Sequence, residues 1–141
     1  MSAGSEKQMT NIVIDTNVFI SAALSPSGTS ARIANLVSDT KEIQIFYSKA
    51  ILAEYIRVLA YGRLNIAKEM QNRIIDTLKK FGTLIEPPTS TIPMPDETDR
   101  IFYDTAKASR AILITGNIKH FPKEPFIMTP SEYLKLIIQE K

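Results

Sequence analysis

The stretch Ile12-Val13-Ile14-Asp15-Thr16-Asn17 decides the fold, because an apolar run there ends abruptly in a carboxylate. Three consecutive β-branched residues are typical of a strand buried on both faces, as in a parallel sheet. Asp15 would then stand at the carboxyl edge of that sheet, where open α/β folds bind their ligands. A simpler purpose is also open to Asp15, since an aspartate often caps the turn or helix after a strand.

The pattern of a short apolar run followed by polar residues recurs later in the chain. Ile112-Leu113-Ile114 precedes Thr115-Gly116-Asn117, which favours a second buried strand of the same kind. Further strands are predicted over 43–47, 83–85 and 126–128, and helices over 29–38, 65–81, 96–109, from the cap Ser48 to about residue 60, and from 130 onward. This alternation predicts an α/β fold with a parallel sheet covered on both faces.

Composition limits what such a fold can be. The 141 residues are 44% apolar and include no apolar run long enough to span a bilayer, so we expect one soluble domain over residues 11–141 and no membrane partner. Residues 1–10 are small and polar, which predicts a disordered tail or a remnant of an expression tag. Cysteine is absent, which excludes disulfide scaffolds and thiolate sites and favours the cytoplasm.

Four acids lie where this fold would bring them to one edge: Asp15, Glu54, Asp96 and Asp99. Each has an ordinary alternative, because Glu54 can pair with Arg57 on a helix, and Asp96 with Asp99 can cap a helix start. Their combination favours a metal site. Phosphodiester cleavage without cysteine or a histidine pair calls for several carboxylates around divalent ions, and Mg²⁺ and Mn²⁺ take oxygen ligands.

These residues resemble the PIN domain family, and within it the toxins of toxin–antitoxin pairs. The likeness runs from Asn11 to about Ile137. It rests on motifs that follow one another along the chain: Asp15-Thr16-Asn17-Val18-Phe19, Ile51-Leu52-Ala53-Glu54-Tyr55, Asp99 with Ala106 following, Thr115-Gly116-Asn117 and His120-Phe121-Pro122. The resemblance implies a three-layer α/β/α sandwich with a central parallel sheet and a metal-dependent ribonuclease activity. It also implies that Asp15, Glu54 and Asp99 are the catalytic metal ligands, accompanied by the hydroxyl of Thr115.

The chain departs from the family pattern at Asn117, where many PIN domains carry a fourth acid. An amide oxygen can ligate magnesium but brings no charge, so a second ion would be held more weakly. Asp96 and Asp104 are the candidate substitutes. If one helix includes all three residues, Asp96 lies about 60° and Asp104 about 140° around it from Asp99, which favours Asp96. Asp104 remains a candidate metal ligand, because an acid in an otherwise apolar turn is unfavourable unless it has a partner.

Candidate substrate-binding residues adjoin the acids. They are Thr16, Asn17, Thr115, Lys119 and His120, and further cations suited to a nucleic-acid backbone are Lys49, Arg57, Lys107, Arg110 and Lys123. His120 is the only histidine, and we expect a role for it because a histidine can act as a general acid or base. The formal net charge is only +2, which permits an anionic partner without requiring one.

The expected reaction is hydrolysis of single-stranded RNA by water whose pKa is lowered by Mg²⁺ or Mn²⁺. Expected partners are RNA, an antitoxin protein, and a second copy bound through the helices between Ser48 and Phe81. One alternative is a degenerate PIN domain that binds RNA or a protein without cleavage, which Asn117 favours. Another is a phosphotransferase with Asp15 as nucleophile, which Asn17 disfavours because such enzymes carry a second aspartate there.

Overall fold

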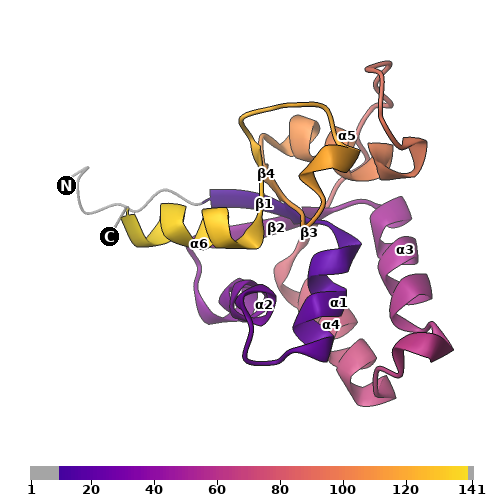
Figure 1. The fold of residues 1–141 in the computed structure, drawn as a ribbon, viewed down its shortest axis with the longest axis vertical. Helices are drawn as coiled ribbons and strands as arrows, with labels where there is room; N and C mark the ends of the chain where they lie inside the picture. Colours follow the sequence, from indigo (N-terminus) through magenta and orange to yellow (C-terminus); the bar gives the residue numbers. More distant parts are fainter. Residues whose placement is uncertain (1–9, 140–141) are drawn as a thin grey trace.

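Five parallel strands form the centre of the molecule (Figure 1). The computed structural model describes residues 10–139. The strands are β1 (Thr10–Ile14), β2 (Ile43–Tyr47), β3 (Thr83–Leu84), β4 (Ile112–Ile114) and β5 (Ile127–Met128), in the spatial order β3-β2-β1-β4-β5. β1 pairs in parallel with β2 on one side and with β4 on the other. The chain therefore builds one half of the sheet, returns to the centre, and then builds the other half.

Helices cover both faces of the sheet. They are α1 (Thr16–Leu24), α2 (Thr29–Asp39), α3 (Lys49–Leu59), α4 (Lys68–Phe81), α5 (Arg100–Ser109) and α6 (Pro130–Gln139), with short 3₁₀ turns η2 (Gly62–Leu64), η3 (Glu97–Asp99) and η4 (Ile118–His120). Figure 1 shows α1, α2 and α4 on one side of the sheet and α5 on the other. The expected three-layer α/β/α arrangement with a parallel sheet is confirmed.

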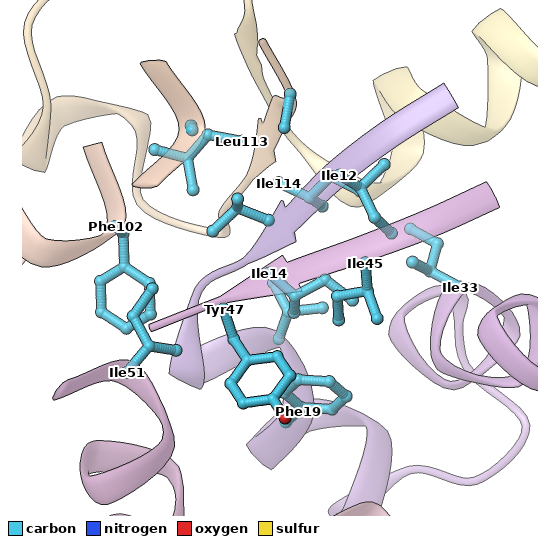
Figure 2. Close-up of a cluster of buried hydrophobic side chains, with 14 of the residues drawn as sticks. Ile12, Ile14, Phe19, Ile33, Ile45, Tyr47, Ile51, Phe102, Leu113 and Ile114 are labelled. Carbon is cyan, nitrogen blue, oxygen red and sulfur yellow. The ribbon is translucent and has the colours of Figure 1, made fainter. Parts of the chain in front are cut away.

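The core lies on both faces of the two central strands. Ile12, Val13 and Ile14 are completely buried, as their apolar run predicts. Figure 2 shows Ile14 and Phe19 packed on the side of α1, with Phe102 of α5 on the opposite side of the strands. Because side chains alternate along a strand, β1 contributes to both layers, and this fixes its register against β2 and β4.

The structure corrects several expected boundaries. Helix α1 starts at Thr16, directly after Asp15, where the sequence indicated only a polar step. The helix expected from Asn65 begins at Lys68, because Asn65 is left-handed (φ 52°) and closes η2. The helix expected from Asp96 begins as η3 and becomes regular at Arg100. Thr10 already belongs to β1, and residues 1–9, where the tail was expected, lie outside the described residues.

Two helix ends agree with their sequence signals. The Ser48 hydroxyl accepts a hydrogen bond from the Ile51 amide (3.2 Å) and caps α3 as expected. Gly82 ends α4, and its conformation is ordinary, but a Cβ there would lie 2.5 Å from the Leu78 carbonyl oxygen. The glycine is therefore required by close packing. Within residues 10–139, no helix is both long enough and apolar enough to span a membrane.

Candidate metal centre

Asp15 lies at the carboxyl edge of the sheet, at the junction of β1 and α1 (Figure 1). Its backbone amide continues the sheet by donating to the Ile114 carbonyl (2.9 Å). It occupies the N-cap position of α1, yet its side chain makes no capping hydrogen bond. The carboxylate instead accepts from the Thr115 hydroxyl (2.7 Å) and the Asn17 side-chain amide (3.3 Å). Burial raises its pKa, although the bond from Thr115 acts in the opposite direction.

Glu54 approaches the same edge from the second turn of α3. Its carboxylate accepts a hydrogen bond from the buried hydroxyl of Thr16, the first residue of α1 (2.5 Å). Its other oxygen lies 3.8 Å from the Arg57 guanidinium, so the helical pairing anticipated from sequence is present but loose. The charge of Glu54 is close enough to raise the pKa of both Asp15 and Asp99.

Asp99 carries the most perturbed carboxylate of the cluster. It is the last residue of η3 and the N-cap of α5. Burial and then the charges of Asp15 and Asp96 raise its pKa to about 6. Among the described residues, its buried Oδ2 has no hydrogen-bond donor, although His120 Nδ1 lies 3.3 Å away. The site therefore holds a carboxylate oxygen that is removed from water without full compensation.

Asp96 and His120 stand beside Asp99 at the entrance to the cluster. Within residues 10–139, these three residues form the one set of acidic and histidine side chains whose ligand atoms all lie within 4.8 Å of one another. Asp96 accepts from the Thr98 hydroxyl (2.7 Å) and the Thr98 amide, and these bonds lower its pKa. Asp96 reaches this position as the cap of η3 and not through the helical spacing expected from sequence.

The loop after β4 supplies a polar wall to the site. Thr115 is fully buried, donates its hydroxyl to Asp15, and accepts from the Asn117 amide (3.0 Å). Asn17 accepts from the Gly116 amide (3.3 Å) and so ties this loop to α1. Asn117 is exposed and contributes its backbone to this network, while Lys119 is exposed on η4 next to His120.

Asp104 does not join the cluster, contrary to its inclusion among the candidate ligands. It lies inside α5 and is buried, and its Oδ2 accepts from the Ser90 backbone amide (3.0 Å). Arg100 binds the carbonyl and hydroxyl of the same serine, both at 2.9 Å. The acid in an apolar turn therefore anchors the proline-rich segment over residues 87–95.

Sequence reasoning gave no role to Tyr55, which it named only within the motif Ile51-Leu52-Ala53-Glu54-Tyr55. Tyr55 is completely buried, and its hydroxyl donates to the carbonyl of Ile14, the residue before Asp15. Burial and the nearby charges of Asp15 and Glu54 hold its pKa well above the ordinary value, so it stays a neutral donor. No signal in the sequence separates this tyrosine from a core aromatic, because it also packs edge-on against Phe19.

The donor set suits a hard divalent cation. Asp15, Glu54 and Asp99 come from separate segments, yet the charge of Glu54 helps to raise the pKa of Asp15, and the charges of Asp15 and Glu54 help to raise the pKa of Asp99. Such mutual repulsion disfavours three ionised carboxylates, and a cation among them would relieve it. Mg²⁺ and Mn²⁺ prefer oxygen ligands such as carboxylates. Oδ2 of Asp99 accepts no hydrogen bond from the described residues, so it is available to bind such an ion. The residues therefore fit such a metal.

Comparison with known proteins places this arrangement in a family. Residues 11–119 match the family model of the PIN domain. The chain belongs to the PIN domain family. The uncharacterized protein MJ1680 of Methanocaldococcus jannaschii is 36% identical to this chain over 115 residues, with 79% of this chain and 74% of the relative covered.

Two solved structures share the fold of this PIN domain at low sequence identity. VapBC2 from Rickettsia felis, bound to a DNA fragment from its promoter, superposes with a TM-score of 0.56 and 19% identity, over 85% of this chain and 97% of that chain. PAE2754 from Pyrobaculum aerophilum superposes with a TM-score of 0.60 and 13% identity, over 98% of this chain and 96% of that one. At these identities the two comparisons establish the fold.

Proposed function

We propose that this PIN domain is a metal-dependent endoribonuclease that hydrolyses single-stranded RNA. Asp15, Glu54 and Asp99 would hold Mg²⁺ or Mn²⁺ at the carboxyl edge of the sheet. The observation that supports the proposal is the raised pKa of Asp99 in η3, which burial and nearby charges, including those of Asp15 after β1 and Glu54 in α3, bring to about 6. Carboxylates whose pKa is raised by burial and by neighbouring charges destabilise a fold, and they are typical of functional sites.

The surrounding residues keep these carboxylates oriented. Thr115 and Asn17 hold Asp15, and Thr16 holds Glu54, so that the remaining carboxylate oxygens are left for a ligand. When bound, the metal would supply an activated water and charge stabilisation at the phosphodiester. His120 lies at the rim beside Asp99, with about half of its side chain exposed. It is placed to donate a proton or hydrogen bond to a phosphate.

Asp96 is our candidate for the acid that Asn117 does not provide. Its carboxylate lies in the cluster with Asp99 and His120, and its lowered pKa keeps it ionised. An anionic ligand there would strengthen a second cation position more than the neutral amide of Asn117 can. Mn²⁺ titration followed by calorimetry gives the test, since Asp96→Asn should lower the number of ions bound or weaken one class of site.

The biological setting belongs to the same proposal. The likeness of the fold to VapBC2 supports, at the level of architecture, a role as a cytoplasmic toxin with an antitoxin protein as its partner. A homodimer remains a prediction of the sequence. The apolar faces of α3 and α4 are largely used by the core through residues such as Tyr55 and Leu78. Ile56, which is 47% exposed on α3, is left available for a second copy.

RNA cleavage with a matched acidic control tests the function. The purified protein is incubated with a labelled single-stranded RNA and Mn²⁺, and the Asp15→Asn variant is compared with Asp39→Asn. Asp39 is exposed at the end of α2, near the start of β2 and away from the carboxyl edge. We expect Asp15→Asn to lose at least about a hundredfold in rate, as removal of a central catalytic group does, and Asp39→Asn to match the wild type.

The same experiment separates cleavage from simple binding. Equal cleavage by Asp15→Asn and the wild type would refute the site, because cleavage would then not depend on the Asp15 carboxylate. Absence of cleavage together with intact RNA binding would favour the degenerate PIN domain that Asn117 suggests. Calorimetry with Mn²⁺ distinguishes the two further, since a domain that only binds RNA has no need of the metal.

A further inference from the structure

Tyr61 stands exposed at the corner that follows α3, and two arginines accompany it. The guanidinium carbons of Arg57 and Arg63 lie 5.8 and 5.6 Å from the centre of its ring. Arg57 also donates a hydrogen bond to the Tyr61 hydroxyl. Tyr61 and Arg63 are both exposed, and the Arg57 side chain is 58% exposed. An aromatic ring with two cations beside it is therefore presented to solvent.

The corner itself is held by the backbone. The Leu64 amide donates to the Tyr61 carbonyl (3.1 Å), and the Asn65 amide donates to the Gly62 carbonyl (3.0 Å). Asn65 then takes a left-handed conformation, which asparagine tolerates better than most residues, and turns the chain toward α4. The ring is thus mounted on a defined turn and not on a free loop.

Arg57 connects this corner to the acidic cluster. Its guanidinium lies 3.8 Å from Glu54 and also donates to the Tyr61 hydroxyl, so these contacts link Glu54 in α3 to the corner after that helix. From Glu54 to the end of α3 at Leu59 the helix rises about 8 Å, and Tyr61 follows two residues later. A strand whose phosphate lies at the acids would therefore pass the corner within a few nucleotides.

We propose that Tyr61, with Arg57 and Arg63, forms a stacking platform for a base of single-stranded RNA. The inference rests on the proposed action on single-stranded RNA. Aromatic rings and guanidinium planes both stack on bases, and this contact is stronger than an exposed cation–π contact. A base can replace one guanidinium over the ring, and the displaced cation can then bind a flanking phosphate. A base held in a duplex cannot reach the ring in this way, so the platform selects unpaired RNA.

The absence of tryptophan makes a direct test possible. Tyr61→Trp introduces a single tryptophan, whose fluorescence a stacked base should quench. The matched control is Phe81→Trp, because Phe81 is 37% exposed where Tyr61 is 36%, and Lys80 lies over its ring at 5.3 Å. Phe81 ends α4, a helix of 14 residues that spans about 20 Å, so it is far from the corner.

The titration uses the full chain in EDTA, so that binding is read without cleavage. A single-stranded RNA oligomer should quench Tyr61→Trp, an abasic oligomer of equal length should quench it far less, and neither should affect Phe81→Trp. Tyr61→Leu should weaken RNA binding roughly five- to hundredfold, while Tyr61→Phe keeps the ring and stays near the wild type. The abasic oligomer should bind Tyr61→Leu and the wild type alike.

Three results would overturn the platform. They are no quenching at position 61, equal quenching at positions 61 and 81, and unchanged RNA affinity in Tyr61→Leu. The last result would show that the Tyr61 ring does not contribute to RNA binding. None of them depends on metal or cleavage, so a protein that fails to cut RNA can still pass this test, and an active nuclease can still fail it.

Discussion

The hydroxyl of Thr115 donates to the buried carboxylate of Asp15 across 2.7 Å, and this bond joins two strand ends that are one hundred residues apart in the chain. Thr115→Val keeps the shape but removes the donor. Because a hydrogen bond to a charged group is lost, we expect the free energy of unfolding to fall by about 1 to 3 kcal/mol in urea denaturation. Thr115→Ser keeps the hydroxyl and should lose only about 1 kcal/mol for the methyl group.

The metal affinity of the same variants gives a second measurement. Without its donor, the Asp15 carboxyl has a higher pKa, because the Thr115 bond opposes the effect of burial. Thr115→Val should therefore bind Mn²⁺ about tenfold more weakly near neutral pH, with Thr115→Ser close to the wild type. Identical Mn²⁺ affinity in all three proteins would contradict a role for this bond in preparing the site.

The raised pKa of Asp99 makes the metal-free protein depend on pH in a defined direction. The native carboxyl keeps its proton up to a pKa of about 6, whereas the ordinary pKa of an aspartate is 3.8. Between these values the native state binds more protons than the unfolded state, so stability falls as pH rises from about 4 to about 6. Asp99→Asn has no such proton to lose. In EDTA it should melt a few degrees higher than the wild type at neutral pH and match it below about pH 4.

Metal should reverse that order. Mn²⁺ binds only the folded state, so it stabilises the wild type and has little effect on Asp99→Asn. Thermal melts in EDTA and in Mn²⁺, over a series of pH values, provide both comparisons. If Asp99→Asn melts below the wild type in EDTA at neutral pH, the native state stabilises the ionised carboxylate, and the raised pKa assigned to Asp99 is wrong.

Asp104 provides a test of a structural acid beside a functional one. Asp104→Ala leaves the Ser90 amide without its acceptor, which should cost about 1 to 3 kcal/mol and expose the segment over residues 87–95 to proteolysis. Asp104→Asn keeps an oxygen for that amide and places a donor where Oδ1 now lacks a partner among the described residues. It should be within about 0.5 kcal/mol of the wild type. Both variants should bind Mn²⁺ normally, and weaker binding in Asp104→Asn would return this residue to the metal centre.

Two glycines differ in what they tolerate. At Gly82 an added Cβ would lie 2.5 Å from the Leu78 carbonyl oxygen and 2.9 Å from the Tyr47 ring, so Gly82→Ala should cost about 1 to 3 kcal/mol. At Gly62 nothing lies within 4 Å, and Gly62→Ala should be neutral or stabilising by up to about 1 kcal/mol. Urea denaturation of the pair measures the difference, and equal stability would show that α4 can shift to make room.

The sequence predicted the sheet well because its strands carry a simple signal. The apolar side chains of β1 and β2 are buried on the faces of the sheet beneath the helices, so local pattern and final position agree. Helix α1 was missed for the opposite reason. Its nine residues include only three polar ones, Thr16, Asn17 and Ser21, and Thr16 is itself buried, so only a weak polar face marks the helical period.

The site was only partly predictable. Asp15 lies directly after β1, as its strand-end position predicted, but the place of Asp104 was not predicted, since the acceptor needed by the Ser90 amide is visible only in the folded chain. Asp96 was favoured through an assumed helix, yet it is an extended cap residue that binds Thr98. Local patterns do not encode such contacts, because their partners come from distant or irregular segments.

The return of the chain to the centre of the sheet also governs when the site can first exist. β4 inserts beside β1 only after residues up to Ile114 have been synthesised, and Thr115 then reaches Asp15. A growing polypeptide on the ribosome has Asp15 and Glu54 early, but it lacks the wall that completes their surroundings until Thr115 has emerged. Fragments that end before Thr115 should therefore lack the complete site, and the proposed activity should require synthesis to continue past that residue.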